Sequence, residues 1–348
     1  MPLTRKTPTG RHRRCDGAPG RSRRLALGWA LSLLGGLLTA GVTLPAAAQD
    51  SYPNKPIRVV VPYPPGGVSD AVTRAVVQKL AERLSNPIVV DNQGGANGQI
   101  GSAAVARAAP DGYTLLVVVA AHAINPSLYT RMSYAPLTDL TGVSLFGHIP
   151  LLLVSSAKVP ASQLKDLVAW GQAHPGSLTY ASSGTGSGAH LVGELFAQTV
   201  GLPMTHVPYK GIAPALPDLF SGQVSMIFDS VQTMLPHVKA GKLNALAMTS
   251  AQRWPGAPEV PTMAELGYPS LTTGSWIGLL APAKTPKPVL QRLAAETQKV
   301  LDAPEMRQKL IDYGIDPVGG TPAQFDAFIR SEAARWAQVV QQAQIHLD

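Results

Sequence analysis

Two kinds of hydrophobic pattern alternate along most of the chain after residue 50. Short apolar runs bounded by turn residues, typical of buried strands, occur at residues 57–61, 88–90, 113–120, 151–155, 178–182, 205–207, 224–228 and 243–248. Helical patterns lie between them at residues 70–84, 101–109, 164–173, 189–200 and 231–240, with a short helix opened by Pro214. Strands that alternate with helices in this way predict an α/β fold with mostly parallel sheets.

The C-terminal section is helical. Helices are predicted for residues 287–301, 304–313 and 322–343, each with a proline at or near its first turn. Two strand–helix series followed by this section predict two lobes, with crossings near residues 145–150 and 273–280. We expect lobe 1 to comprise residues 49–148 and 275–348, and lobe 2 to comprise residues 149–274.

The N-terminal segment has the features of a secretory signal peptide. A basic region precedes an apolar run at residues 25–44, and a small-residue site follows, so residues 1–48 are expected to be removed by cleavage after Ala48. The alternative is an uncleaved anchor, because the apolar run is about long enough to span a bilayer. The general secretory route is favoured, twin-arginine export remains open, and an upstream misassigned start codon also remains open.

The net charge of the mature protein is much smaller than that of the whole chain. The whole chain has a formal charge of +8, but residues 1–48 hold 8 of the 29 basic and 1 of the 21 acidic residues, which leaves +1. A nearly neutral mature protein gives no support to broad attraction for nucleic acid. The one cysteine, Cys15, lies in the removed segment, so disulfides, thiolate metal sites and cysteine nucleophiles are excluded from the mature protein.

The first candidate site is the turn between the strand at residues 57–61 and the helix that begins near Ser69. Its sequence, PYPPGG at residues 62–67, places unpaired backbone N–H groups at a helix N-terminus, where the helix dipole favours an anion. Asp70 complements the dipole but would oppose that anion. It could face away, hold a water, or meet an ammonium group of the ligand, and the sequence leaves its orientation open.

A second strand-to-helix loop, at residues 183–188, is rich in glycine, serine and threonine. Its N–H groups and hydroxyls form a donor cluster suited to a carboxylate or phosphate. The alternative is a flexible turn in which Ser187 caps the following helix. His190 could touch a ligand, or it could cap or pack, and it could pair with Glu194 four residues later.

Catalytic motifs are weak in this chain. Ser187 lacks the flanking glycines of a nucleophile elbow, and neither a P-loop nor a dinucleotide fingerprint is present. No histidines are spaced as a helical metal pair, so we expect no cofactor, no metal and no catalytic residues. The alternative enzyme is an exported hydrolase that uses Ser187 and His190, although a spacing of three residues at a helix start is poor geometry for nucleophile and base.

Eight ordered groups of motifs run through about 300 residues of the mature sequence. They are 52–57 (YPNKPI), 61–67 (VPYPPGG) with Asp70, 110–116 (PDGYTLL), 125–129 (NPSLY), 184–187 (GTGS) with His190 and Leu191, 206–211 (HVPYKG), 261–262 (PT) with 265–267 (ELG), and 276–282 (WIGLLAP). Together they resemble the substrate-binding components of tripartite tricarboxylate transporters, the Bug family. One departure is QGGANG at residues 93–98, where the family often reads PGAGG.

The resemblance implies a periplasmic, two-lobed protein of Venus-flytrap, type II-like architecture that closes on a small solute in the cleft between its lobes. It implies that the turn at residues 66–70 and the loop at residues 183–187 face each other and hold a carboxylate through N–H groups, hydroxyls and waters. The expected ligand-binding residues are Tyr63, Pro65, Gly66, Gly67, Ser69, Asp70, Ser183, Gly184, Thr185, Gly186, Ser187, His190, Tyr209 and Asp229.

The expected partners are the small carboxylate and the large and small membrane subunits of the transporter, with no nucleic acid, and the protein is expected to be a monomer. A periplasmic sensor that presents its closed form to a signalling partner is the alternative function. The sequence leaves the identity of the ligand and the choice between transport and sensing open.

Overall fold

The computed structural model describes residues 52–347 of the 348-residue chain. The predicted signal peptide and its cleavage site lie outside the described residues. The described residues all belong to one compact unit, and none of the helices among them combines the length and the apolar character that a membrane span requires.

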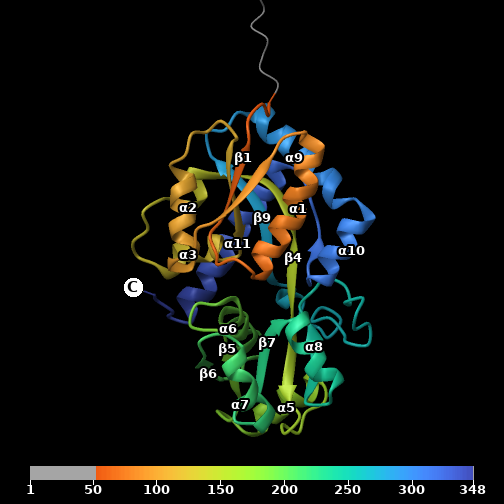
Figure 1. Cartoon of the computed structure of the whole chain (residues 1–348). Coiled ribbons are helices and arrows are strands. Elements are labelled where there is room, and N and C mark those ends of the chain that lie inside the picture. The colour runs from red at the N-terminus through yellow and green to blue at the C-terminus, as the bar shows by residue number, and fades with distance from the viewer. Residues whose placement is uncertain (1–51, 348) are drawn as a thin grey trace, which may run out of the picture. The chain divides into compact units, whose positions relative to one another are not determined.

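Two lobes are built around one long strand, β4 (Leu140–Ser156), which takes part in both sheets. The upper sheet in Figure 1 has the order β2–β1–β3–β9–β4, and the lower has the order β4–β7–β5–β6. The other strands are β1 (Ile57–Val61), β2 (Ile88–Asn92), β3 (Thr114–Val119), β5 (Thr179–Ser182), β6 (Thr205–Pro208), β7 (Met226–Ser230), β8 (Leu243–Met248), β9 (Gly274–Pro282) and β10 (Asp316–Pro317). Both β8 and β10 pair with β4.

The expectation of mostly parallel sheets holds only in part. Strands β1, β2 and β3 pair in parallel, as do β5, β6 and β7, but β4 and β9 run antiparallel to their neighbours. The sequence pattern predicted only the last part of β4, because Gly142, Gly147 and Pro150 interrupt its apolar run. The two glycines allow neighbouring segments to pack directly against the backbone of β4. A Cβ atom at Gly147 would lie 2.3 Å from the carbonyl oxygen of Asp316.

The two segments expected to cross between the lobes pair with each other. His148 lies opposite Trp276, and Pro150 lies opposite Gly274. After Pro150, β4 exchanges β9 for β7 and β8 as its hydrogen-bonded neighbours. The lobe boundaries at residues 148 and 274 stay a prediction, and this change of partner is the structural feature nearest to them.

Eleven α-helices cover the sheets within residues 52–347. They are α1 (Val68–Leu84), α2 (Gln99–Ala106), α3 (Ala121–Leu128), α4 (Pro136–Asp139), α5 (Leu164–Ala173), α6 (Gly188–Val200), α7 (Leu216–Ser221), α8 (Val231–Lys239), α9 (Lys287–Leu301), α10 (Pro304–Asp312) and α11 (Pro322–Gln342). Short 3₁₀ segments are η1 (Ala96–Gly98), η2 (Ala213–Ala215) and η3 (Pro269–Leu271). The sequence pattern missed α3, which is short and contains Pro126.

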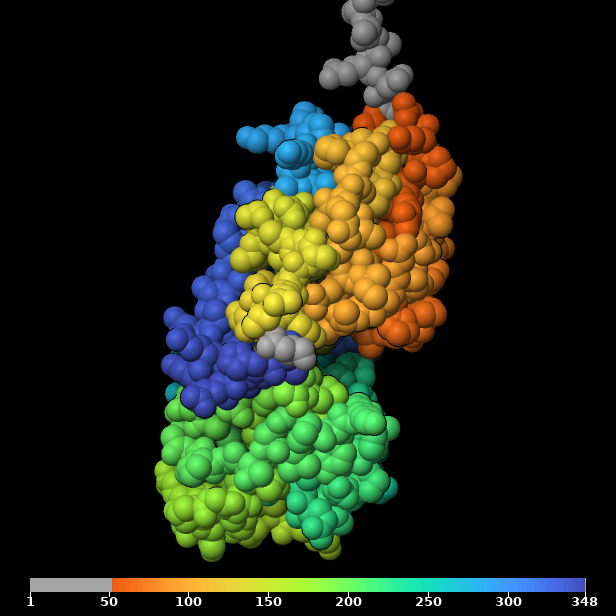
Figure 2. Space-filling view, turned by 90° about the vertical axis from the view of Figure 1, so that its left-hand side faces the viewer, coloured from red at the N-terminus to blue at the C-terminus, as the bar shows by residue number. Residues whose placement is uncertain are grey.

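Three apolar clusters hold these layers together. One joins α1, α9 and α10 to the upper sheet, and another joins α7 and α8 to the lower sheet. The third is continuous through both lobes and includes Trp336 of α11, Phe196 of α6 and Leu280 of β9. Helix α11 packs on α3, β4 and α6, and Figure 2 shows the C-terminal residues, in blue, touching both the upper and the lower part of the molecule. The C-terminal helix therefore contributes to the core of both lobes.

Candidate functional site

The turn after β1 leaves the N-terminus of α1 open. The β-branched residues of β1 are buried in the upper sheet, and the chain then turns at residues 62–67 because prolines cannot continue the ladder. Gly67 occupies the N-cap position of α1, and no side-chain hydrogen bond caps this helix in the described structure. Residues 64–68 are exposed, so the N–H groups of the first turn face a surface that a solute can reach.

Asp70 turns inward rather than toward that surface. Its side chain is only 6% exposed, and Arg74 Nε donates to Oδ1 and Oδ2 at 3.0 and 3.1 Å. The Gly66 N–H donates to Oδ2 at 3.0 Å, and Asn92 Nδ2 donates to Oδ1 at 3.0 Å. The hydrogen bond from Arg74 is the main cause of a lowered pKa for Asp70, so the carboxylate stays ionised and paired. Gly66 adopts φ +85°, a conformation that favours glycine, to reach this carboxylate.

This geometry resolves the conflict between Asp70 and an anion in the same turn. The guanidinium of Arg74 balances the charge, and the carboxylate fixes the turn through the Gly66 N–H. Direct contact between Asp70 and a ligand stays a prediction. Sequence reasoning missed Arg74 and Asn92, although the spacing of Asp70 and Arg74 is that of a helical i, i+4 ion pair.

Tyr63 and the QGGANG segment at residues 93–98 lie beside the turn at residues 62–67. Tyr63 O accepts from Asn92 Nδ2 at 3.1 Å, and burial raises the pKa of its phenol. The QGGANG segment still forms a turn although its sequence differs from the family pattern. Asn97 Nδ2 donates to Asn125 Oδ1 at 2.8 Å, and Asn125 Nδ2 donates back to Asn97 O at 3.1 Å. This pair of bonds ties the turn to α3.

The second loop, between β5 and α6, is held mainly by its own backbone. The Ser187 hydroxyl accepts from the His190 N–H at 3.3 Å and caps α6, as one alternative predicted. The Ser187 N–H donates to Gly184 O at 3.1 Å. Ser183 and Thr185 are exposed, so their hydroxyls are the side-chain groups that this loop offers to a solute.

His190 lies behind the loop and is 4% exposed. Its Nδ1 accepts from the Gly186 N–H at 3.0 Å, and its ring stacks on His206 with centroids 3.7 Å apart. His206 Nε2 lies 2.7 Å from the Ser182 hydroxyl, which is also bonded to Gly184. Burial lowers the pKa of both histidines to about 4, so both rings are neutral at neutral pH. The pair therefore supports the loop, and sequence reasoning missed the contribution of His206.

The geometry does not match a serine hydrolase at Ser187. The His190 Nδ1 is bonded to Gly186, and its Nε2 lies 3.7 Å from Glu194 Oε1. Among the hydrogen bonds of residues 52–347, none joins the His190 ring to the Ser187 hydroxyl. Glu194 also accepts from the hydroxyl of Tyr180, which stacks against the same histidines.

Tyr209 and Asp229 lie at the ends of β6 and β7, in the lower lobe. The Tyr209 hydroxyl donates to Asp218 Oδ2 at 2.6 Å, and burial raises its pKa to about 12. Burial also raises the pKa of Asp229 to about 6, against the hydrogen bond of 2.7 Å that it accepts from the Ser230 N–H. Ligand contact by either residue stays a prediction.

Each of the two loops is a hydrogen-bonded turn, and their facing each other across a cleft stays a prediction. No hydrogen bond within the described part of the chain joins residues 62–70 to residues 183–187. The lower loop instead approaches α3 and the C-terminus, since a Cβ atom at Gly186 would lie 3.0 Å from Leu128 and 2.6 Å from Leu347. No group of three or more His, Cys, Asp or Glu side chains suited to a metal ion occurs among residues 52–347.

Two lobes joined by crossing strands, with a strand-to-helix donor loop in each, define a solute-binding protein of the periplasmic class. The family model of the tripartite tricarboxylate transporter family receptor, TctC, matches residues 72–345, and the chain belongs to this family. The resemblance to the Bug family is confirmed. BugT of Bordetella pertussis is 39% identical over 308 residues, which cover 88% of this chain and 94% of BugT.

Solved structures agree with this assignment. A Rhodopseudomonas palustris protein solved with adipate is 35% identical, with a TM-score of 0.72, and the match covers 85% of this chain and 100% of that one. MatC from the same organism, solved with bound malate, is 33% identical, with a TM-score of 0.67 and coverage of 83% and 100%. The family consists of solute-binding receptors, and its members include periplasmic binding proteins.

Proposed function

We propose that this chain is a periplasmic receptor that captures a small carboxylate between its lobes and delivers it to the large and small membrane subunits of a tripartite transporter. The observation that carries the proposal is the pair of exposed strand-to-helix loops, one of them with the charge of Asp70 already balanced by Arg74. Relatives solved with adipate and with malate support the choice of a carboxylate.

In this proposal, neutral donors hold the carboxylate. The upper lobe contributes backbone N–H groups from the first turn of α1, and the lower lobe contributes the hydroxyls of Ser183 and Thr185. Such donors stabilise an anion through hydrogen bonds and helix dipoles without a formal positive charge. Closure is a hinge motion, and the ligand favours the closed state only by the extra contacts that it makes there.

Native mass spectrometry of protein isolated from the periplasm tests the class of ligand directly. We expect a co-purified carboxylate, and we expect aliphatic, hydroxylated or aromatic carboxylates to raise the melting temperature in a thermal-shift panel. At a hundredfold excess over Kd, one ligand adds about 2.7 kcal/mol to the free energy of unfolding. A panel in which no carboxylate raises the melting temperature would contradict the proposal.

Thr185→Val tests the lower loop, because it removes a hydroxyl and keeps the shape of the side chain. We expect carboxylate affinity to fall by about fivefold to tenfold, as for the loss of one charge-assisted hydrogen bond. Thr205→Val makes the same change at an exposed position of β6, outside the loops, and should bind like the wild type. Equal affinity of the two variants would remove Thr185 from the site.

Two further measurements test location and role. N-terminal sequencing of the periplasmic protein should begin at Gln49, whereas an anchored protein would retain residues 1–48 and appear in the membrane fraction. Deletion of this chain should abolish uptake of the co-purified carboxylate if the protein serves transport. Unchanged uptake together with an altered transcriptional response would identify a sensor instead.

A further inference from the structure

A short segment follows α11 in the described structure and runs back against α3. Gln344 adopts φ +52°, a left-handed conformation that ends the helix, and the Ile345 N–H donates to Val340 O at 3.1 Å. Two residues later, the Leu347 N–H donates to Leu128 O of α3 at 2.9 Å. The C-terminal segment, residues 344–347, is therefore tied down by backbone hydrogen bonds to two helices.

The side chain of Leu347 reaches the lower loop, residues 183–187. A Cβ atom at Gly186 would lie 2.6 Å from Leu347 Cδ1 and 3.0 Å from Leu128 Cδ1. Leu128 is 1% exposed, and both leucines pack in the apolar cluster that is continuous through the two lobes. The two leucines therefore cover one side of Gly186 and leave no room for a side chain there.

Gly186 is the residue on which the form of the lower loop depends. Its φ is +77°, and its N–H donates to His190 Nδ1 at 3.0 Å. The Ser187 N–H closes the turn by donating to Gly184 O at 3.1 Å. A displacement of Gly186 would break this turn, which places the hydroxyl of Thr185 at the surface.

Helix α3 connects this contact to the upper turn, residues 62–67. Asn125 of α3 and Asn97 exchange two hydrogen bonds, of 2.8 and 3.1 Å. Gly94, in the same segment as Asn97, packs on the upper turn, since a Cβ atom there would lie 3.4 Å from Pro64. Asn125 and Leu128 are one helical turn apart, so α3 contacts the supports of both loops.

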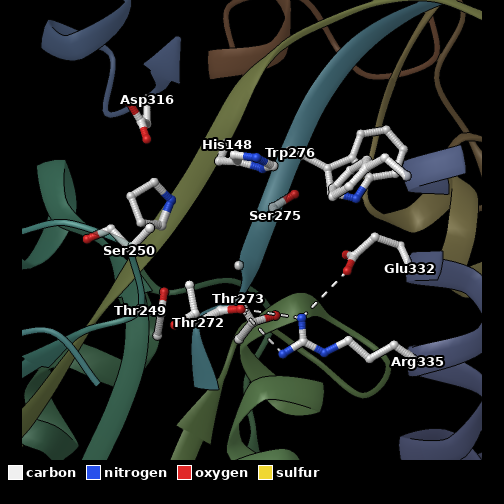
Figure 3. A pocket seen from close by; sticks show the side chains of 14 residues that line it. His148, Thr249, Ser250, Thr272, Thr273, Ser275, Trp276, Asp316, Glu332 and Arg335 are labelled. Atoms are coloured by element: carbon white, nitrogen blue, oxygen red, sulfur yellow. Dashed lines mark hydrogen bonds and ion pairs between the residues drawn. The ribbon is translucent and has the colours of Figure 1, made fainter. Parts of the chain in front are cut away.

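Helix α11 has a fixed position before the C-terminal segment begins. Arg335 donates to Ser270 O at 2.5 Å and to Thr272 O at 3.4 Å (Figure 3). Its guanidinium also lies 3.6 Å from Glu332 Oε1. These bonds join α11 to the chain between β8 and β9, so the helix gives the C-terminal segment a firm origin.

We propose that Leu347 and Leu128 are positioning residues for the lower loop, and that the C-terminal segment holds Gly186 in the conformation that presents donors to a solute. Its effect on binding rests on the proposed function, whereas its effect on the loop does not. Without these contacts, the loop takes its donor conformation only part of the time. The apparent affinity for a carboxylate then falls in proportion to that fraction.

Amide hydrogen exchange of the ligand-free protein tests the positioning role. In Leu347→Ala, we expect the Gly186 and Ser187 amides to exchange about tenfold faster than in the wild type. The Gly66 amide of the upper turn should keep its wild-type rate. His346→Ala is the matched control, because it shortens an exposed side chain in the same segment and should change none of these rates.

The conservative variant Leu347→Met nearly keeps the volume of the side chain, so its loop amides should exchange close to the wild-type rate. Wild-type exchange of the loop amides in Leu347→Ala would overturn the proposal. Equal acceleration at Gly66 would show general destabilisation instead of a local effect, and it would overturn the proposal too.

Calorimetry with adipate and with malate, the ligands of two solved relatives, tests the consequence for binding. Leu347→Ala should weaken an anion that binds the wild type by about threefold to tenfold, and His346→Ala should bind it like the wild type. Unchanged affinity in Leu347→Ala would contradict the role in binding. If neither anion binds the wild type, the proposed function loses support, while faster loop exchange in Leu347→Ala still supports the positioning role.

Discussion

Single residues decide whether the two loops can accept an anion. Asp70 would repel a carboxylate if its charge faced the turn, but Arg74 balances that charge and the Gly66 N–H is bonded to it. His190 and His206 are neutral and support the second loop from behind. Both loops are therefore supported by charged or titratable residues that lie beneath the surface offered to a solute.

Asp70→Asn tests this role. We expect a loss of about 1–3 kcal/mol in the free energy of unfolding, because one partner of a buried, charge-assisted network is removed. The folded pKa of Asp70 lies below 3.8, so its stabilisation is present above pH 3.8 and is lost as pH falls through the folded pKa. Urea unfolding of the wild type and the variant, at neutral pH and at pH values down to below 3.8, measures both the loss of stability and its pH dependence.

Asp91→Asn is the matched control. Asp91 pairs with Arg58 at the surface, where both side chains are at least 36% exposed, so its removal should cost less than about 1 kcal/mol. Equal losses in the two variants would contradict the role assigned to Asp70.

The stacked histidines also make the protein less stable as pH falls, as Asp70 does. The cause differs, because burial disfavours the charged form of the histidines whereas hydrogen bonds favour the charged form of Asp70. Burial lowers their folded pKa from 6.5 to about 4, so the unfolded chain takes up protons first as pH falls. Their stabilisation is full above pH 6.5 and declines as pH falls toward 4. Between about pH 7 and about pH 5, we expect a loss of roughly 1–2 kcal/mol for each ring.

Urea unfolding at these two pH values should show a smaller loss in His206→Asn than in the wild type. His174→Asn, at an exposed position after α5, should keep the wild-type loss. The same loss in all three proteins would assign the pH dependence to other groups.

At the scale of elements, close packing between α11 and β9 joins the C-terminal helix to the crossing strands. Phe325 of α11 lies directly over Gly278 of β9. A Cβ atom at Gly278 would lie 2.3 Å from Phe325 Cζ and 3.0 Å from Ser144 O. Only a residue without a side chain allows this approach.

Gly278→Ala should therefore overpack the junction and cost about 1–3 kcal/mol in the free energy of unfolding. Gly188→Ala provides the control. Gly188 is the first residue of α6, and no atom lies within 4 Å of the position that a Cβ atom would take there, so this change should be neutral or stabilising by up to about 1 kcal/mol. Thermal or urea unfolding of the two variants compares them. Similar stability would show that the junction repacks freely.

At the scale of the whole molecule, the crossing strands and α11 determine how the lobes can move. Strands β4 and β9 are paired at the crossing, and α11 belongs to the core of both lobes. Motion of the lobes must therefore bend this shared region while each sheet moves as a unit.

Small-angle X-ray scattering measures this motion. We expect the radius of gyration to decrease when a carboxylate that raises the melting temperature is added, and to stay constant with a carboxylate that does not. Thr185→Val should need a higher ligand concentration for the same decrease. A ligand that stabilises the protein without any decrease would indicate binding without closure.

The sequence by itself determined most of the element types, the two strand-to-helix loops and the family, whereas α3, α4, β9 and β10 were not predicted. Strand β1, helices α5 and α9 and strand β8 match their predicted bounds, because each has a strong period and clear turn residues at its ends. The loops were recognisable because glycine, proline and hydroxyl residues cluster between a buried strand and an amphipathic helix.

Only the tertiary structure decided the antiparallel crossing of β4 and β9, the orientation of Asp70 and the pairing of His190 with His206. Each depends on contacts between residues far apart in sequence, such as His148 with Trp276 and Asp70 with Asn92. Local periodicity carries no information about such partners. The sequence therefore shows the charge of Asp70 and a possible helical partner in Arg74, but only the fold shows that the carboxylate turns inward to Asn92.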